Sequence, residues 1–187
     1  MKIAILILTG LAAIPAYADH PGGRLDEVMA QKEPAFSAID RQGTPALSSM
    51  DADGAPIDLE RLSDQVVVLS FLPAACGTSC AEQQALLEKV REGVAASAMR
   101  DMVTFLTVSY ADVSGGADGN GVVVRPQGRI EDVIERFRTR SPQEFRAPLV
   151  HVIARGGRHA GIFEGAAFRP INMVLYVNGL TNEHEAH

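Results

Sequence analysis

The sequence predicts an α/β fold in which a central mixed sheet carries helices on both faces and an N-terminal β-hairpin. Two observations lead to this fold class. Short apolar runs rich in β-branched residues are typical of buried strands and occur at 66–71, 102–109, 122–124 and 149–154. Segments with helical periodicity lie between them, at 81–94 and 126–140. Strands that alternate with helices indicate a sheet that is covered on both sides.

Ahead of the first buried strand, the predicted elements are weaker. The polar segment 19–32 predicts a short helix that is loosely tied to the body, and 36–47 predicts an irregular segment. Residues 47–50 and 56–59 flank the turn signal Asp53-Gly54, a pattern that predicts a small β-hairpin. The same turn lacks the further ligands and the closing glutamate of a calcium loop, so we interpret it as a turn alone.

The second half of the chain continues the pattern. Residues 111–121 are rich in glycine without periodicity and predict a flexible loop. The tight turn Gly156-Gly157 leads into a hairpin strand at 159–163, which is expected to close one edge of the sheet. Pro170 is favourable at a first helical position and predicts a terminal helix that ends at Leu180. The polar tail 181–187 is expected to be frayed.

The first eighteen residues predict a secretory signal that is removed. Lys2 provides a basic start, 3–14 an apolar core, and Ala16-Tyr17-Ala18 a small-x-small cleavage pattern. A retained membrane anchor is the alternative, but the apolar core is short for a bilayer and ends at Pro15. The mature chain is therefore expected to work in the periplasm or another extracytoplasmic compartment, without a stable membrane span.

The excess of acidic over basic residues limits the classes of partner that the chain can bind. The formal net charge is −6, from 17 basic and 23 acidic residues. This balance disfavours nucleic acid and anionic membranes as partners. A hydrophobic fraction of 47% over 187 residues is enough for one packed domain.

The only two cysteines, Cys76 and Cys80, lie where the first buried strand passes into a helix. Unpaired backbone N–H groups and the helix dipole stabilise an anion at such a helix start, so they lower the pKa of the first thiol. Cys76 is thus expected to be the exposed thiolate, with Cys80 as its partner in the first turn. In an oxidising compartment this pair forms a disulfide, binds metal, or is kept reduced by a partner.

The spacing of the two cysteines leaves these chemistries open. Residues i and i+4 of a regular helix have Cβ atoms about 5–6 Å apart, whereas a disulfide requires about 3.5–4.5 Å. The bond can close only if Cys76 lies in the preceding loop, as Pro73 and Gly77 permit. The same spacing suits two thiolates that hold Cu(I). A permanent structural bridge is the weakest interpretation, because so short a loop removes little entropy from the unfolded chain.

The order of elements, the cysteine pair and Ala147-Pro148 ahead of the third strong strand resemble the thioredoxin fold. Within that fold the chain is most similar to the Sco/SenC family of copper and thiol proteins, which assemble cytochrome oxidase. The matching pieces are 51–54, 66–71, the CxxxC of Cys76 and Cys80, and 105–109. The resemblance covers 45–180, which it marks as the thioredoxin-like domain. Residues 1–18 are then the signal, 19–44 an N-terminal extension and 181–187 the tail.

Two departures from the family pattern affect the expected site. Sco proteins carry a histidine as third copper ligand, and matching by position places Arg146 there. Arg146 would lower the pKa of Cys76 if it lies nearby; otherwise it is a surface residue. Ala147-Pro148 resembles the proline loop of thioredoxins, where a cis proline abuts the disulfide, although Pro148 could instead be an ordinary proline that opens a strand. The second departure is the glycine-rich loop at 111–121, which replaces an Asp-Pro turn and helix.

The resemblance implies thiol–disulfide exchange with protein thiols or disulfides, those of an oxidase subunit or of another copper protein. In this interpretation Cys76 attacks, Cys80 resolves the mixed disulfide and Pro148 orders the partner chain, and no cofactor is required. The rival interpretation is a metallochaperone that holds copper with Cys76, Cys80 and a histidine, of which His151 is the first candidate. A thiol peroxidase is disfavoured because the usual threonine–cysteine pattern is missing.

Overall fold

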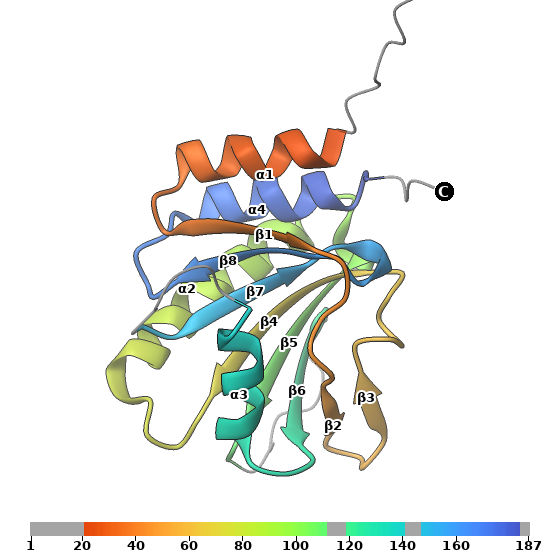
Figure 1. Ribbon diagram of the computed structural model, residues 1–187, viewed down its shortest axis with the longest axis vertical. Coiled ribbons are helices and arrows are strands. Elements are labelled where there is room, and N and C mark those ends of the chain that lie inside the picture. Colours follow the sequence, from red (N-terminus) through yellow and green to blue (C-terminus); the bar gives the residue numbers. More distant parts are fainter. Residues whose placement is uncertain (1–20, 112–118, 141–146, 184–187) are drawn as a thin grey trace, which may run out of the picture.

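A single mixed sheet dominates the computed structural model, which describes residues 21–111, 119–140 and 147–183 (Figure 1). Its strand order is β1-β8-β7-β4-β5-β6-β2-β3. The strands are β1 (Phe36–Arg41), β2 (Ser48–Met50), β3 (Pro56–Asp58), β4 (Val66–Leu72), β5 (Val103–Ser109), β6 (Gly121–Pro126), β7 (Leu149–Ile153) and β8 (His159–Glu164). The α-helices are α1 (Pro21–Lys32), α2 (Gly77–Ala95), α3 (Ile130–Arg138) and α4 (Pro170–Leu180).

The centre of the sheet is β4, whose apolar run fits a strand that is buried on both faces. It pairs in parallel with β5, and β5 pairs in parallel with β6. On its other side β4 pairs antiparallel with β7, so that Leu69 lies opposite both Leu106 of β5 and His151 of β7. The helix α2 connects the parallel strands β4 and β5. The predicted α/β class with a mixed central sheet is confirmed.

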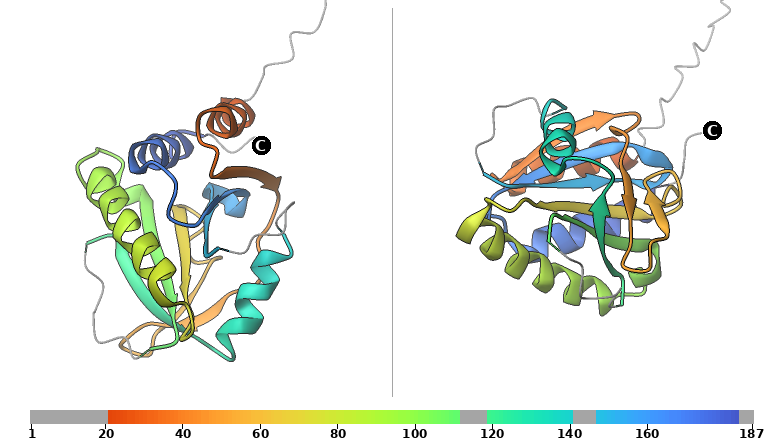
Figure 2. Two further views of the ribbon diagram at one scale, coloured as in Figure 1. Left: turned by 90° about the vertical axis from the view of Figure 1, so that its left-hand side faces the viewer. Right: turned by 90° about the horizontal axis from the view of Figure 1, so that it is seen from below.

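Helices cover both faces of this sheet, as the alternation of strands and helices predicts (Figure 2). On one face, Val66 and Val68 of β4 belong to a core cluster with buried residues of α2 and α4. On the other face, Val67, Leu69 and Phe71 belong to a second cluster with residues of α3. Because successive side chains of a strand point to opposite faces of the sheet, β4 contributes residues to both clusters.

The segment around β1 corrects two expectations. Residues 36–47 were expected to be irregular, but 36–41 form an edge strand that pairs antiparallel with β8. The ring of Phe36 packs over Gly161 and lies 4.9 Å from the ring of Phe163. The apolar signal is weak because an edge strand buries little beyond Phe36, so polar residues conceal it. β1 closes the sheet edge that the β7–β8 hairpin was expected to close, and it does so from within the predicted N-terminal extension.

Ion pairs at Arg158 fix both ends of the described chain, so the expected loose attachment of the first helix is wrong. The Arg158 guanidinium donates to Asp26 of α1 at 2.6 Å, to Asp40 of β1 at 3.1 Å and to Glu183 at 2.8 Å. Tyr176 of α4 donates its hydroxyl to Asp26 at 2.6 Å. The tail is therefore anchored as far as Glu183, where fraying was expected.

The remaining expectations for the peripheral elements hold in part. The predicted hairpin is confirmed as β2–β3, and one carboxylate oxygen of Asp51 accepts from the backbone N–H groups of Asp53 and Ala55 within its turn. β6 extends to Pro126, which pairs with Ser49, so α3 starts four residues later than predicted. The terminal helix α4 has the predicted bounds.

No helix within 21–111, 119–140 and 147–183 is both long and apolar enough to cross a bilayer. The predicted signal segment and most of the glycine-rich loop lie outside the described residues.

Candidate functional site

The two cysteines lie at the junction of β4 and α2, as the sequence predicts. β4 ends at Leu72, and the turn that follows is closed by a hydrogen bond from the backbone N–H of Cys76 to the carbonyl oxygen of Pro73, at 3.2 Å. Cys76 is the N-cap of α2, and Gly77 then adopts a φ of +61°. Such a left-handed conformation is readily adopted by glycine, which explains why a glycine follows Cys76. The first cysteine thus lies outside the regular helix.

The sulfurs of Cys76 and Cys80 form a disulfide, with the two Cα atoms 5.6 Å apart. Cys80 is only 3% exposed, whereas Cys76 is half-buried. The first turn of α2 has no acidic side chain, and no side chain in the described part of the chain caps its start. After reduction, a thiolate at Cys76 would therefore lie at the positive end of the helix dipole without a competing negative charge in that turn.

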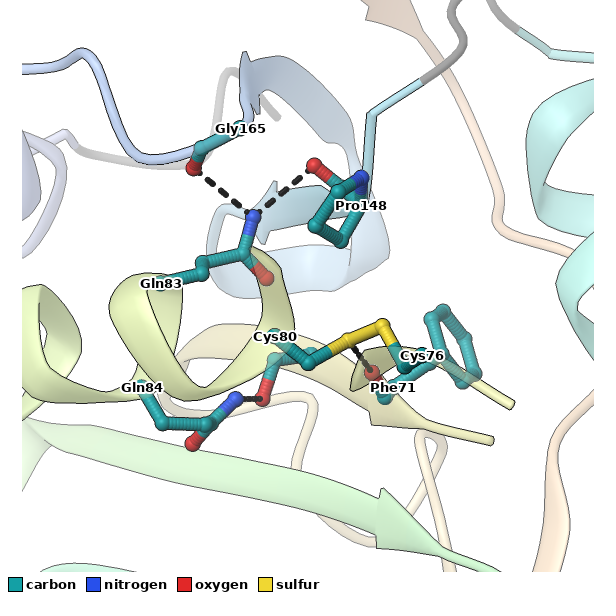
Figure 3. Close-up of a disulfide and its surroundings, with 8 residues drawn as sticks. Phe71, Cys76, Cys80, Gln83, Gln84, Pro148 and Gly165 are labelled. Carbon is teal, nitrogen blue, oxygen red and sulfur yellow. Dashed lines mark hydrogen bonds between the residues drawn. A yellow bond between two sulfur atoms is a disulfide. The ribbon is translucent and has the colours of Figure 1, made fainter. Parts of the chain in front are cut away.

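A backbone carbonyl contacts the buried sulfur. The Sγ atom of Cys80 lies 3.8 Å from the carbonyl oxygen of Phe71 (Figure 3). In the reduced protein a thiol at Cys80 can donate to this oxygen, and that contact favours the neutral form of Cys80. The two sulfurs therefore have different surroundings, which is the arrangement that an attacking and a resolving thiol require.

The chain on either side of Cys76 carries no charge over a long stretch of sequence. No residue from Val66 to Ala81 carries a charge. Tyr110 is 65% exposed directly after β5, and its backbone N–H donates to the carbonyl oxygen of Leu72 at the end of β4. An exposed aromatic ring thus follows the strand that lies next to the cysteine turn.

The structure describes Pro148 but not Arg146. The peptide bond between Ala147 and Pro148 is trans, because no bond between described residues is cis. The expectation of a cis proline is therefore wrong, and Pro148 is an ordinary proline that directly precedes β7. Its carbonyl oxygen accepts a hydrogen bond from the side chain of Gln83, in the helix that carries the cysteines. Arg146 lies outside the described residues.

His151 lies in the interior of the protein. It is 1% exposed, and its Nδ1 atom is 3.2 Å from Nε2 of His159, which is fully buried. The rings of Phe71 and Phe137 pack edge-on against His151, with ring centroids 5.9 and 5.2 Å away. The cysteine pair contacts the backbone of Phe71, whereas His151 contacts its ring. Among the described residues, no three side chains of the metal-ligating types lie close enough together to hold an ion.

Burial shifts both histidines in the same direction. It holds the pKa of His151 well below 6.5, with smaller contributions from His159 and Arg138. Burial also lowers the pKa of His159 to about 4, with Arg140 and Arg41 adding to the effect. Both rings are therefore neutral at pH 7, and one donates to the other. Sequence reasoning placed His159 on the hairpin but not in the core.

Sequence reasoning missed Gln83, which lies fully buried in α2 between the cysteines and the Pro148 segment. A signal for it was present: Gln83 precedes the buried positions Leu87, Val90 and Val94 on the same helical face. A polar side chain on the apolar face of an amphipathic helix usually has a specific hydrogen-bonding role.

No protein-family model and no curated protein matches the chain. Solved structures do match it. A SCO1/SenC family lipoprotein from Bacillus anthracis superposes with a TM-score of 0.60 at 15% identity, covering 78% of this chain and 98% of the other. BsSco, described as a Sco family protein of cytochrome c oxidase assembly with a disulfide switch, gives 0.59 at 14% identity, over 76% and 95%. ScoI of Bradyrhizobium japonicum, solved with copper bound, gives 0.52 at 13% identity, over 76% and 99%.

At these identities the likeness shows the fold. The chain has the thioredoxin-like architecture that its sequence predicts, and its resemblance to Sco/SenC proteins is confirmed as a likeness of structure.

Proposed function

We propose that this chain is a Sco/SenC-like thiol–disulfide exchange protein that acts outside the cytoplasm, in the assembly of a copper centre such as that of cytochrome c oxidase. One observation carries the proposal: a disulfide at the start of α2 joins a half-exposed sulfur, Cys76, to a buried one, Cys80. A permanent bridge gains little stability from so short a loop, whereas an accessible sulfur at a helix start suits reversible exchange.

The exchange is a two-step transfer between two dithiols. A partner thiolate attacks Sγ of Cys76, a new S–S bond joins the two proteins, and the sulfur of Cys80 leaves as a thiolate that takes up a proton. A second partner thiolate then attacks the partner's own sulfur in that mixed disulfide and releases Cys76. The partner is oxidised by two electrons, and this chain is reduced by two. The reverse sequence reduces a partner disulfide.

The partner class and the compartment follow from different observations. BsSco is described as an assembly protein of cytochrome c oxidase, which supports an oxidase subunit or another copper protein as the partner. The predicted signal at 1–18 supports export to the periplasm or a comparable compartment. Within such a compartment a dithiol needs partners to be reduced, so exchange with protein thiols is the expected chemistry.

Copper handling is the second candidate, favoured by the copper that is bound in ScoI. The described residues fit it less well. They provide the two cysteine sulfurs as donors, but His151 is buried under α3 and is hydrogen-bonded to His159. Two sulfurs alone can hold Cu(I) as a soft ion.

Equilibration with glutathione tests the proposal. The purified protein is incubated in buffers of varied reduced-to-oxidised glutathione ratio, and free thiols are counted by alkylation and mass spectrometry. We expect Cys76 and Cys80 to interconvert reversibly and together between the dithiol and the disulfide. In parallel, the reduced protein is titrated with Cu(I). A bridge that stays closed at every ratio contradicts the exchange proposal. Tight one-to-one Cu(I) binding by a protein that does not exchange disulfides would support the carrier instead.

A further inference from the structure

The side chain of Gln83 connects the cysteine helix to two segments at the same end of the sheet. Gln83 follows Cys80 by three residues in α2 and is fully buried. Its Nε2 atom donates to the carbonyl oxygen of Pro148 at 2.8 Å and to that of Gly165 at 2.9 Å (Figure 3). Both hydrogens of the amide are thereby used.

The strand register explains why these two segments lie beside the disulfide. β7 runs antiparallel to β4, with Val150 opposite Ser70, so the start of β7 lies near the end of β4 from which the cysteine turn departs. β8 runs antiparallel to β7, with Glu164 opposite Leu149, so Gly165 follows at the same end. The backbone N–H of Gly165 also donates to the carbonyl oxygen of Pro148, at 2.8 Å.

Packing alone does not explain an amide at this position. The Oε1 atom of Gln83 is buried and has no hydrogen-bond partner among the described residues. An unsatisfied buried acceptor is unfavourable, and a leucine of similar size would avoid that cost. The two donated hydrogen bonds are therefore the distinctive contribution of Gln83. A carboxylate could not make them.

We propose that Gln83 is a positioning residue for exchange with polypeptide partners: it fixes the Pro148 and Gly165 segments against the cysteine helix, so that a partner chain bound at Cys76 meets a rigid surface. The inference rests on the proposed exchange function and specifies its substrate class, a cysteine within a polypeptide segment. Gln83 does not contact the reacting sulfurs in this role. A small disulfide reaches Cys76 without using the two segments, so its reaction does not depend on Gln83.

Two substrates and three variants test this role. The substrates are a synthetic peptide closed by a cystine bridge and the small disulfide dithiobis(nitrobenzoate), each reacted with the reduced protein. Gln83→Leu removes both donated hydrogen bonds. Gln84→Leu is the matched control, because Gln84 is the next residue of the helix but donates to Ser70 of β4 instead. Gln83→Glu keeps the size of the side chain, and circular dichroism checks that each variant is folded.

We expect Gln83→Leu to lower kcat/KM for the peptide by at least about tenfold, mainly through KM, because misplaced contacts weaken orientation. Its reaction with the small disulfide, and both reactions of Gln84→Leu, should stay within about twofold of wild type. For Gln83→Glu we expect the ratio of peptide rate to small-disulfide rate to be low at pH 8 and to recover in part as the carboxyl is protonated, because a carboxylic acid can donate one of the two hydrogen bonds. The thiolate fraction of Cys76 cancels in that ratio.

The outcomes separate a failure of the positioning role from a failure of the proposed exchange function. If Gln83→Leu matches wild type on both substrates, or loses both reactions equally while folded, the positioning role is wrong. If Gln83→Leu does not fold, the ratio measured for Gln83→Glu decides, and an unchanged ratio overturns the role. If the wild type reacts with neither substrate, the proposed exchange function itself fails.

Discussion

Replacing Cys76 by serine is expected to lower the rate of disulfide exchange by at least about a thousandfold, because it removes the sulfur that a partner can reach. The remaining thiol, Cys80, is 3% exposed and faces the carbonyl oxygen of Phe71. The measurement is the reduction of a cystine-bridged peptide by the chemically reduced protein, followed by chromatography of the peptide thiols.

The matched control for this substitution is Thr78→Ala, an exposed position in the first turn of α2. It should exchange disulfides at the wild-type rate. Loss of the short bridge is expected to cost about 2 kcal/mol of stability at most, so urea unfolding should show a folded Cys76→Ser protein. A Cys76→Ser protein that reduces the peptide as fast as wild type would remove the attacking role from Cys76.

Acid is expected to destabilise the protein through its buried histidine pair. In the unfolded chain a histidine takes up its proton near pH 6.5. Burial lowers the pKa of His159 in the folded protein to about 4. Between these values the unfolded state binds more protons, so stability falls as the pH falls from about 6.5 to about 4. The shift of His159 alone corresponds to about 3 kcal/mol over that range, and His151 acts in the same direction.

The double variant His151→Leu/His159→Leu isolates this effect, because both partners of one buried hydrogen bond become apolar together. Free energies of unfolding in urea are compared at pH 7 and pH 4.5 for both proteins. We expect wild type to lose more stability than the double variant on acidification, by at least about 2 kcal/mol, which is the share of His159 alone between these two pH values, with His151 adding to it. Other titrating groups, such as Asp26 and Glu183, affect both proteins alike. Equal losses would mean that the pair does not carry the acid sensitivity.

Elements with a strong local pattern could be predicted from the sequence. β4, β5 and β7 are short apolar runs that are buried on both faces, and α4 begins at the proline that marks a first helical position. The cysteine site could be placed for the same reason, since a buried strand, a turn and an amphipathic helix follow one another around it. Local sequence patterns determine these features, so a single sequence is enough to predict them.

Features that depend on distant partners could not be predicted. β1 is a strand because β8 offers it an edge, and Phe36 and Ile39 are its only large apolar residues. Arg158 donates to Asp26, which is 132 positions away in the sequence. Gln83 donates to the carbonyl oxygen of Gly165, which is 82 positions away. His159 contacts His151 across a hairpin whose register shifts between Val152 and Ile153. Spacing along the sequence does not identify the distant partner in such a contact.

The proposed exchange depends on an asymmetry between two sulfur atoms, which glutathionylation of single-cysteine variants measures most directly. Reduced Cys80→Ser and reduced Cys76→Ser are each exposed to oxidised glutathione, and the mixed disulfide is quantified by intact mass spectrometry, natively and in urea. We predict that Cys80→Ser is modified in the folded state, whereas Cys76→Ser is modified only after urea unfolds it. Equal modification of the two folded variants, or native modification of Cys76→Ser alone, would contradict the assignment of Cys76 as the sulfur that partners attack.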